Sequence, residues 1–124
     1  MSVRWGGFCR AKDLSVDGPH IDIELSDGRR QRVTVEEQDD SYLLSAIVAR
    51  RAVVSASPDL PIQACLRNRM AALVGFRVDR SSRLVGEAWV PKEGLSAEEF
   101  QFYVRTVAAA CDRFEYVLTG RDVE

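Results

Sequence analysis

Few side chains in this sequence have acid–base or nucleophilic chemistry. There is one histidine, His20, and there are three cysteines, Cys9, Cys65 and Cys111, far apart and without a Cys-x-x-Cys pair. Catalysis of these types needs a nucleophile, a base and a group that orients the base, and zinc sites combine several closely spaced Cys or His residues. Glycine-rich phosphate loops are also absent. We therefore expect no enzymatic activity, no catalytic or metal-binding residue and no cofactor.

Cys9 is the cysteine with the most basic surroundings, since Arg4, Arg10 and Lys12 are near it in sequence. A low thiol pKa would make it reactive, so a thiol enzyme is one alternative hypothesis. Cys65 and Cys111 fall within apolar helical patterns. An odd number of scattered cysteines is typical of reduced thiols in a cytosolic protein, and we expect them in the core.

A candidate basic patch lies in SDGRRQRVTV, residues 26–35, which contains Arg29, Arg30 and Arg32. The preceding Asp-Gly pair predicts a type I′ hairpin turn. Beyond it Arg30 and Arg32 alternate with apolar residues, and acidic residues of the preceding strand are available to pair with them. These arginines are therefore expected to form a solvated hairpin face, with a phosphate or other small ligand as the alternative.

A second group of arginines is more dispersed: Arg67, Arg69, Arg77, Arg80 and Arg83. We expect them on the outer face of a helix and at a hairpin turn, with a local basic patch as the alternative. The overall charge also argues against nucleic acid as a partner, because 17 Lys and Arg residues against 19 Asp and Glu give a net charge of −2, whereas nucleic-acid binders are usually strongly basic. No membrane-length apolar run or signal peptide is evident, so we expect a cytoplasmic protein with no membrane partner.

The elements that must position these residues follow from hydrophobic periodicity. Residues 1–19 are expected to form an irregular or short N-terminal segment, and residues 20–37 predict a hairpin. Residues 42–48 are apolar on both faces, which is typical of a central strand. Residues 74–91 predict a second hairpin with its turn at 79–82 and its end at Pro91. We expect a single domain, 1–124, of the α+β class, with an antiparallel sheet of about five strands.

Two helices complete the predicted order: three strands, a helix, two strands and a long C-terminal helix. The first helix begins near Ser57–Pro61 and is expected to use an apolar stripe formed by Ile62, Leu66, Met70 and Leu73. The second begins at Ser96, which forms a capping box with Glu99, and Gly120 can cap its end. Its buried stripe is expected to comprise Phe100, Val104, Val107, Cys111, Phe114 and Leu118.

Two helices are too few to cover both faces of such a sheet. We therefore expect the second face to serve external contacts, and the candidate partner-binding surface comprises Tyr42, Leu44, Val85 and Trp89. Large exposed apolar patches are rare on monomers. The expected occupant is a second copy, giving a homodimer, or an extended peptide; the N-terminal segment is expected to cover at most part of this face.

Four stretches resemble the YbjN family, whose fold is that of the type III secretion chaperones: GRRQRVTV, SAIVA, RNRMAALVGFRVD and LSAEEFQFYVRTVAAACDRFEYVL, with Gln31, Asn68 and Asp112 as polar markers. The resemblance covers about residues 20–119. It implies a small, acidic, non-enzymatic and usually dimeric protein, in a superfamily whose well-understood members bind unfolded segments of secreted proteins; YbjN-type members themselves have no settled biochemical activity. Those chaperones open with a substantial helix, which Gly6 and Gly7 disfavour here.

The leading hypothesis is thus a cytoplasmic protein- or peptide-binding module, regulatory or associated with secretion. The alternatives are a structural or scaffold dimer with no client site and a small-ligand sensor that uses the arginines.

Overall fold

The computed structural model describes residues 4–70 and 73–119. Its centre is a six-stranded antiparallel sheet in the order β1-β2-β3-β4-β6-β5. The strands are β1 Leu14–Asp17, β2 His20–Glu24, β3 Arg30–Glu37, β4 Ser41–Ala49, β5 Gly75–Val78 and β6 Leu84–Pro91. The α+β class is as predicted, and so is the order after residue 20 apart from one additional short helix. The sixth strand is β1, within the segment expected to be irregular or short. The central position of β4 is confirmed.

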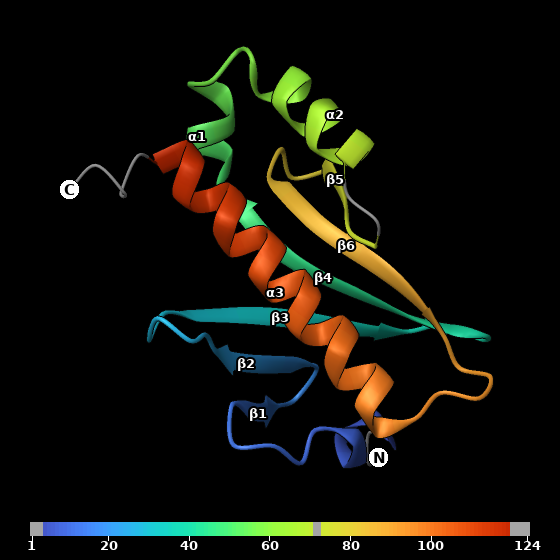
Figure 1. Ribbon diagram of the computed structural model, residues 1–124. Helices are drawn as coiled ribbons and strands as arrows, with labels where there is room; N and C mark the ends of the chain where they lie inside the picture. Colours follow the sequence, from blue (N-terminus) through green and yellow to red (C-terminus); the bar gives the residue numbers. More distant parts are fainter. Residues whose placement is uncertain (1–3, 71–72, 120–124) are drawn as a thin grey trace.

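The helical elements are the 3-10 helix η1 Arg4–Phe8, α1 Arg51–Ser55, α2 Leu60–Met70 and α3 Ala97–Thr119. Figure 1 shows α3 running diagonally across one face of the sheet, with α1 and α2 at one end. Sequence patterning missed α1, which follows directly after β4. The N-terminal segment packs beside the start of α3, where the Trp5 ring stacks on Phe100 with 6.0 Å between centroids.

The predicted start and buried face of α3 are confirmed. Ser96 Oγ accepts a hydrogen bond from the Glu99 amide at 3.1 Å, and Glu99 accepts one from the Ser96 amide at 3.0 Å. Leu118, the last member of the predicted stripe, is partly buried. The other five members are fully buried: Phe100, Val104, Val107, Cys111 and Phe114. The cap expected at Gly120 lies outside the described residues.

The first hairpin turn differs from the prediction. Leu25 donates to the Arg29 carbonyl at 2.7 Å, so three residues, 26–28, form the loop, and among them Gly28 has a positive φ of 87°. A type I′ turn needs positive φ at two positions, whereas a three-residue loop needs it at one. The second hairpin has its turn where expected, with Ser82 in the left-handed region at φ 63°.

The predicted buried face of α2 is wrong. Ile62 and Leu66 are 65% and 52% exposed, and Leu73 lies beyond the helix, 39% exposed; the Met70 side chain lies outside the described residues. Leu60 and Ala64 are the buried positions instead. The physical reason is that α2 packs against β5 at the sheet edge, where one narrow face suffices.

Asn68 fixes α2 to this edge strand. Its side-chain amide donates to the Phe76 carbonyl at 2.9 Å and accepts from the Phe76 amide at 2.6 Å. The side chain thus satisfies the backbone of β5 as a neighbouring strand would, which protects an edge that is otherwise open to pairing. Asn68 thus holds α2 to β5 by two polar contacts.

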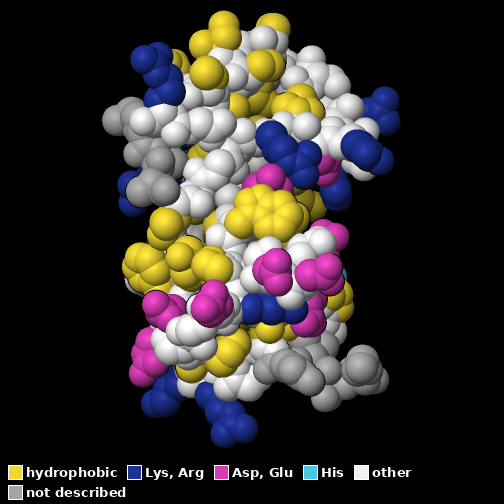
Figure 2. Space-filling model, turned by 90° about the vertical axis from the view of Figure 1, so that its right-hand side faces the viewer, with side chains coloured by type: hydrophobic (Ala, Val, Ile, Leu, Met, Phe, Trp, Pro, Cys, Tyr) yellow, Lys and Arg dark blue, Asp and Glu magenta, His cyan; other side chains and the backbone are white. Residues whose placement is uncertain are grey.

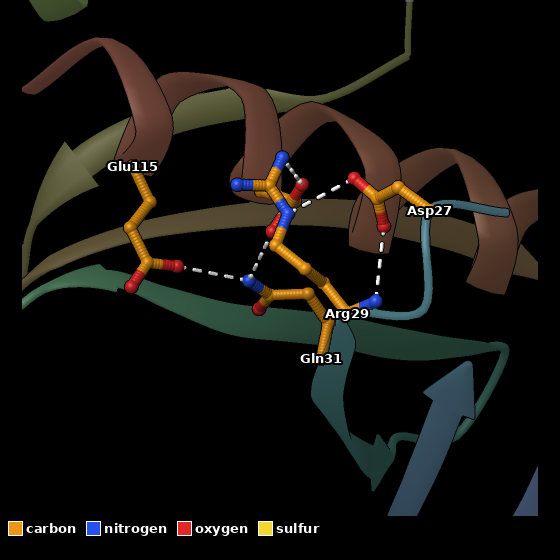
Figure 3. A network of polar contacts seen from close by, with 5 residues as sticks. Asp27, Arg29, Gln31 and Glu115 are labelled. Carbon is orange, nitrogen blue, oxygen red and sulfur yellow. Dashed lines mark hydrogen bonds and ion pairs between the residues drawn. The ribbon is translucent and has the colours of Figure 1, made fainter. Parts of the chain in front are cut away.

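A second polar network joins α3 to β3 (Figure 3). Gln31 donates to Asp112 at 3.3 Å and to Glu115 at 2.9 Å, while Arg29 pairs with Asp112 at 2.7 Å. Asp112 is 9% exposed, so it requires these partners, since a buried charge without them is costly. Gln31, Asn68 and Asp112, the polar markers noted in the sequence, all therefore connect a helix to the sheet.

Candidate functional site

The nucleophilic side chains do not form a site. Cys9 and Cys111 are buried, and burial raises their thiol pKa to about 11 and about 12. Cys65 is exposed on α2, so the expectation that it lies in the core is wrong. Within the described ranges no cluster of three metal-ligating side chains occurs, and no helix there is long and apolar enough to span a bilayer.

The candidate basic patch is divided between the two faces of the sheet. Arg29 lies on the α3 side, with its guanidinium 4.4 Å from the Tyr116 ring centroid and paired with Asp112. Arg32 lies on the other side and pairs with Asp22 at 2.8 Å and Asp17 at 2.9 Å. These hydrogen bonds raise the pKa of Arg32 and lower that of Asp22.

Arg30 is exposed and stands opposite Glu24 in the register of β2 and β3. Arg30 and Arg32 both line a cavity of about 580 Å³, whereas Arg29 does not. The arrangement agrees with a solvated hairpin face and does not gather all three arginines around one ligand.

The predicted partner-binding surface is also divided. Tyr42 and Leu44 are only 6% and 0% exposed, so they cannot contribute to an external surface. They lie on the face of β4 that packs under α3 and are part of the core. Val85 and Trp89 alternate with core residues of β6 and lie on the opposite, open face. Trp89 is 57% exposed there and Val85 is 6% exposed.

The open face holds further apolar and charged groups. Ile47 is 46% exposed, and Arg77 pairs with Glu87 at 3.0 Å. The second carboxylate oxygen of Glu87, Oε1, is buried and has no hydrogen-bond partner among the described residues. This face therefore combines an exposed tryptophan with a carboxylate oxygen that lacks a donor.

A concavity lies on the helical side of the sheet, between α2 and α3. We call it the α2–α3 groove; it has a volume of about 850 Å³ and is lined by Gln63, Leu66, Arg67, Phe76, Phe102, Arg105, Thr106, Ala109, Ala110 and Arg113. Leu66 on α2 and Phe102 on α3 are 52% and 56% exposed. Figure 2 shows hydrophobic side chains gathered at the top of the molecule, where Figure 1 places α2.

Three arginines give the groove its charge. The Arg67 guanidinium lies 4.5 Å from the centroid of the Phe114 ring, a cation–π arrangement. Arg105 pairs with Asp13 through two hydrogen bonds of 2.7 and 2.9 Å, which raise the pKa of Arg105 and lower that of Asp13. Arg113 is exposed on α3. The residues that line the groove, all within the described ranges, include no carboxylate.

Sequence patterning missed this groove. The apolar residues of α2 were assigned to the core, and Phe102 falls outside the buried stripe of α3. One signal in the sequence could have indicated it: α3 carries a large apolar side chain, Phe102, in addition to the complete apolar stripe that packs on the sheet.

Comparison with known proteins identifies the fold. No protein-family model and no curated protein matches the sequence. Among solved structures, YbjN, described as a putative transcription regulator from E. coli, aligns with a TM-score of 0.66 and 17% identity, over 96% of this chain and 89% of that one.

Two further solved structures are complexes. The HopA1–SchA chaperone–effector complex aligns with a TM-score of 0.57 and 11% identity, over 90% of this chain and 88% of that one. The Yersinia pestis type III secretion chaperone SycH, in complex with a fragment of YscM2, aligns with a TM-score of 0.55 and 4% identity, over 90% and 93%. The chain therefore has the fold shared by YbjN and the type III secretion chaperones.

Proposed function

We propose that this chain is a non-enzymatic, cytoplasmic module that binds a segment of another polypeptide in the α2–α3 groove. The observation that carries the proposal is the exposure of Leu66 and Phe102 along a groove of about 850 Å³. Exposed apolar surface of this kind usually marks an interaction site. The SchA and SycH structures, in which a chaperone holds another polypeptide, support the same class of function.

A small-ligand sensor is the weaker alternative. Small-molecule sites usually enclose most of the surface of their ligand, whereas the α2–α3 groove is bordered by side chains that are more than half exposed. Two of the three arginines considered for such a ligand are already paired on opposite faces of the sheet, Arg29 with Asp112 and Arg32 with Asp22. An open groove is better suited to a chain that continues beyond it.

The test uses the full chain and a fluorescein-labelled, permanently unfolded probe, reduced and carboxymethylated lactalbumin. Fluorescence anisotropy should detect binding, and Phe102→Asp should weaken it at least about tenfold, or about 1.4 kcal/mol. Val117→Asp is the matched control, because Val117 is 50% exposed on the same helix and does not line the groove. Absence of probe binding, or equal affinities of both variants and the wild type, would refute the proposal.

We further propose that the chain is a homodimer that uses the open face of the sheet. Trp89 and Ile47 supply exposed apolar surface on that face, 57% and 46% exposed. Exposed apolar surface of this kind usually marks an interaction site. A scaffold dimer with no client site would share this interface but fail the probe test above.

Sedimentation velocity tests the dimer. The wild type should sediment as a dimer at micromolar concentration, and Trp89→Lys should sediment as a monomer with an unchanged circular dichroism spectrum. A monomeric wild type, or a dimer that persists in Trp89→Lys, would contradict this interface.

A further inference from the structure

We propose that the α2–α3 groove selects acidic amphipathic helices, in which one apolar face is flanked by Asp and Glu. The inference rests on the proposed function, because it specifies which polypeptide segments the groove would bind. Three features support it: the positive charge of the groove, the availability of two of its arginines for a partner carboxylate, and the absence of a free strand edge among the described residues that line it.

The charge of the groove is opposite to that of the chain. Its charged lining residues are Arg67, Arg105 and Arg113, with no carboxylate among the described residues that line it. The sequence as a whole has 19 acidic and 17 basic residues, so the segregation is local. Complementary charge at the rim of an apolar site contributes mainly to specificity and to the association rate, and this rim favours a partner that carries carboxylates.

The three arginines are not equally available. Arg105 already pairs with Asp13, so a partner carboxylate would have to compete with that ion pair. Arg67 stacks on the Phe114 ring, and a stacked guanidinium keeps its in-plane N–H donors for bidentate contacts with a carboxylate. Arg113 is exposed. We therefore assign the main charge selection to Arg67 and Arg113 and a smaller part to Arg105.

The groove favours a helix over an added strand. An extended peptide that adds to a sheet binds by pairing with the free backbone of an edge strand. The strand residue in the lining is Phe76, and its amide and carbonyl are both occupied by Asn68. On α3, lining residues Phe102, Thr106, Ala109 and Arg113 are spaced at intervals of three and four, which places them along one side of the helix. Helix-in-groove binding fits this geometry.

The experiment compares two synthetic helical peptides of about 18 residues, or five turns, that share one leucine-rich face. The acidic peptide has Glu on both flanks of that face, and the basic peptide has Lys at the same positions. Fluorescence anisotropy with the full chain should show at least about tenfold tighter binding of the acidic peptide. The preference should decrease as salt concentration rises.

Charge reversal then locates the preference. Arg113→Glu and Arg67→Glu should each reduce the affinity for the acidic peptide and increase that for the basic peptide, with Arg105→Glu having the smallest effect. Arg80→Glu is the matched control, because Arg80 is exposed in the β5–β6 turn and does not line the groove. If either glutamate variant fails to fold, the glutamine variant should still lose at least part of the preference.

The outcomes distinguish this inference from the function on which it rests. Equal affinity for both peptides, with the unfolded probe still bound in a Phe102-dependent manner, would overturn the charge selection and leave the proposed function intact. Absence of binding to the peptides and to the unfolded probe would overturn both. A change from dimer to monomer in Phe102→Asp would assign the groove to a second copy of this chain and also overturn the inference.

Discussion

Helices α2 and α3 differ in what their apolar residues do. On α3 the stripe from Phe100 to Phe114 is fully buried against the sheet, whereas Ile62 and Leu66 on α2 are more than half exposed. A helix across the centre of a sheet finds apolar partners from several strands, and a helix at its edge finds few. The comparison teaches that α2 leaves apolar surface free because its place in the fold does not require that surface.

The means of attachment differ in the same way. The packing of α3 is mainly apolar: the Phe76 and Phe114 rings meet edge to face with 5.0 Å between centroids, and the contact of Gln31 with Asp112 is a local polar addition. The polar amide of Asn68 joins α2 to β5. Apolar side chains of α2 that are not needed for folding can therefore bind another molecule, and substitutions in the two helices should have separable effects on stability and on binding.

The largest difference is expected between Phe114→Ala and Leu66→Ala. Loss of the fully buried Phe114 ring should lower the free energy of unfolding by about 3–5 kcal/mol. Leu66→Ala should change it by no more than about 0.5 kcal/mol, as at other exposed sites. Urea denaturation followed by circular dichroism measures both, and equal losses would show that α2 is as much a part of the core as α3.

The next effect concerns the close approach of α3 to β6. A Cβ atom at Gly86 would collide with the Cys111 sulfur and lie 2.9 Å from Cε1 of Phe76. Gly86→Ala should therefore destabilise the protein by about 1–3 kcal/mol, as overpacking does. Combining it with Cys111→Ala should recover part of the loss. If the double variant lost as much free energy of unfolding as the two single variants together, the contact between position 86 and the Cys111 sulfur would be unimportant.

A smaller effect is expected at the start of α3. Ser96→Ala removes the acceptor of the Glu99 amide and should cost about 1 kcal/mol. Ser96→Asp retains an acceptor and should restore most of the stability in the same urea titration. The capping interpretation would be wrong if the alanine and aspartate variants unfolded at the same urea concentration.

Thiol chemistry compares the helices without substitution. Cys65 is exposed on α2, while Cys111 on α3 is buried and burial raises its pKa to about 12. The thiolate is the reactive form, so Cys65 should react with Ellman's reagent at pH 8 much faster than Cys111. Mass spectrometry of partly modified protein identifies the site. Rapid native modification of Cys111 would contradict the packing of α3.

The sequence allowed β2 to β6 and α3 to be predicted because their apolar residues follow clear periods and because Gly28 and the Ser96–Glu99 pair mark a turn and a helix start. The short strand β1 and the type of the first turn were not predicted. The faces of α2 could not be assigned in this way. Its apolar residues do recur at helical spacing, but which side packs depends on where the helix docks, here against the edge strand β5. For the same reason the groove was not predicted, since it requires the relative positions of two helices separated by β5 and β6.

The predicted partner-binding surface, which combined Tyr42 and Leu44 with Val85 and Trp89, was wrong in part for a related reason. The alternation of β4 gave two apolar faces correctly, yet it did not indicate which face α3 would cover. Tyr42 and Leu44 proved to lie under the helix, while Trp89 lies on the open side.

Site-specific photo-crosslinking tests the central claim most directly. The photoreactive amino acid p-benzoylphenylalanine would replace Phe102 in the groove, Val117 on α3 outside it, or Trp89 on the open face, and each protein would be irradiated with the labelled unfolded probe. We predict strong crosslinking of the probe at position 102 and little at 117 or 89. Crosslinking of the probe at position 89 but not at 102 would contradict the assignment of the α2–α3 groove as the polypeptide-binding site.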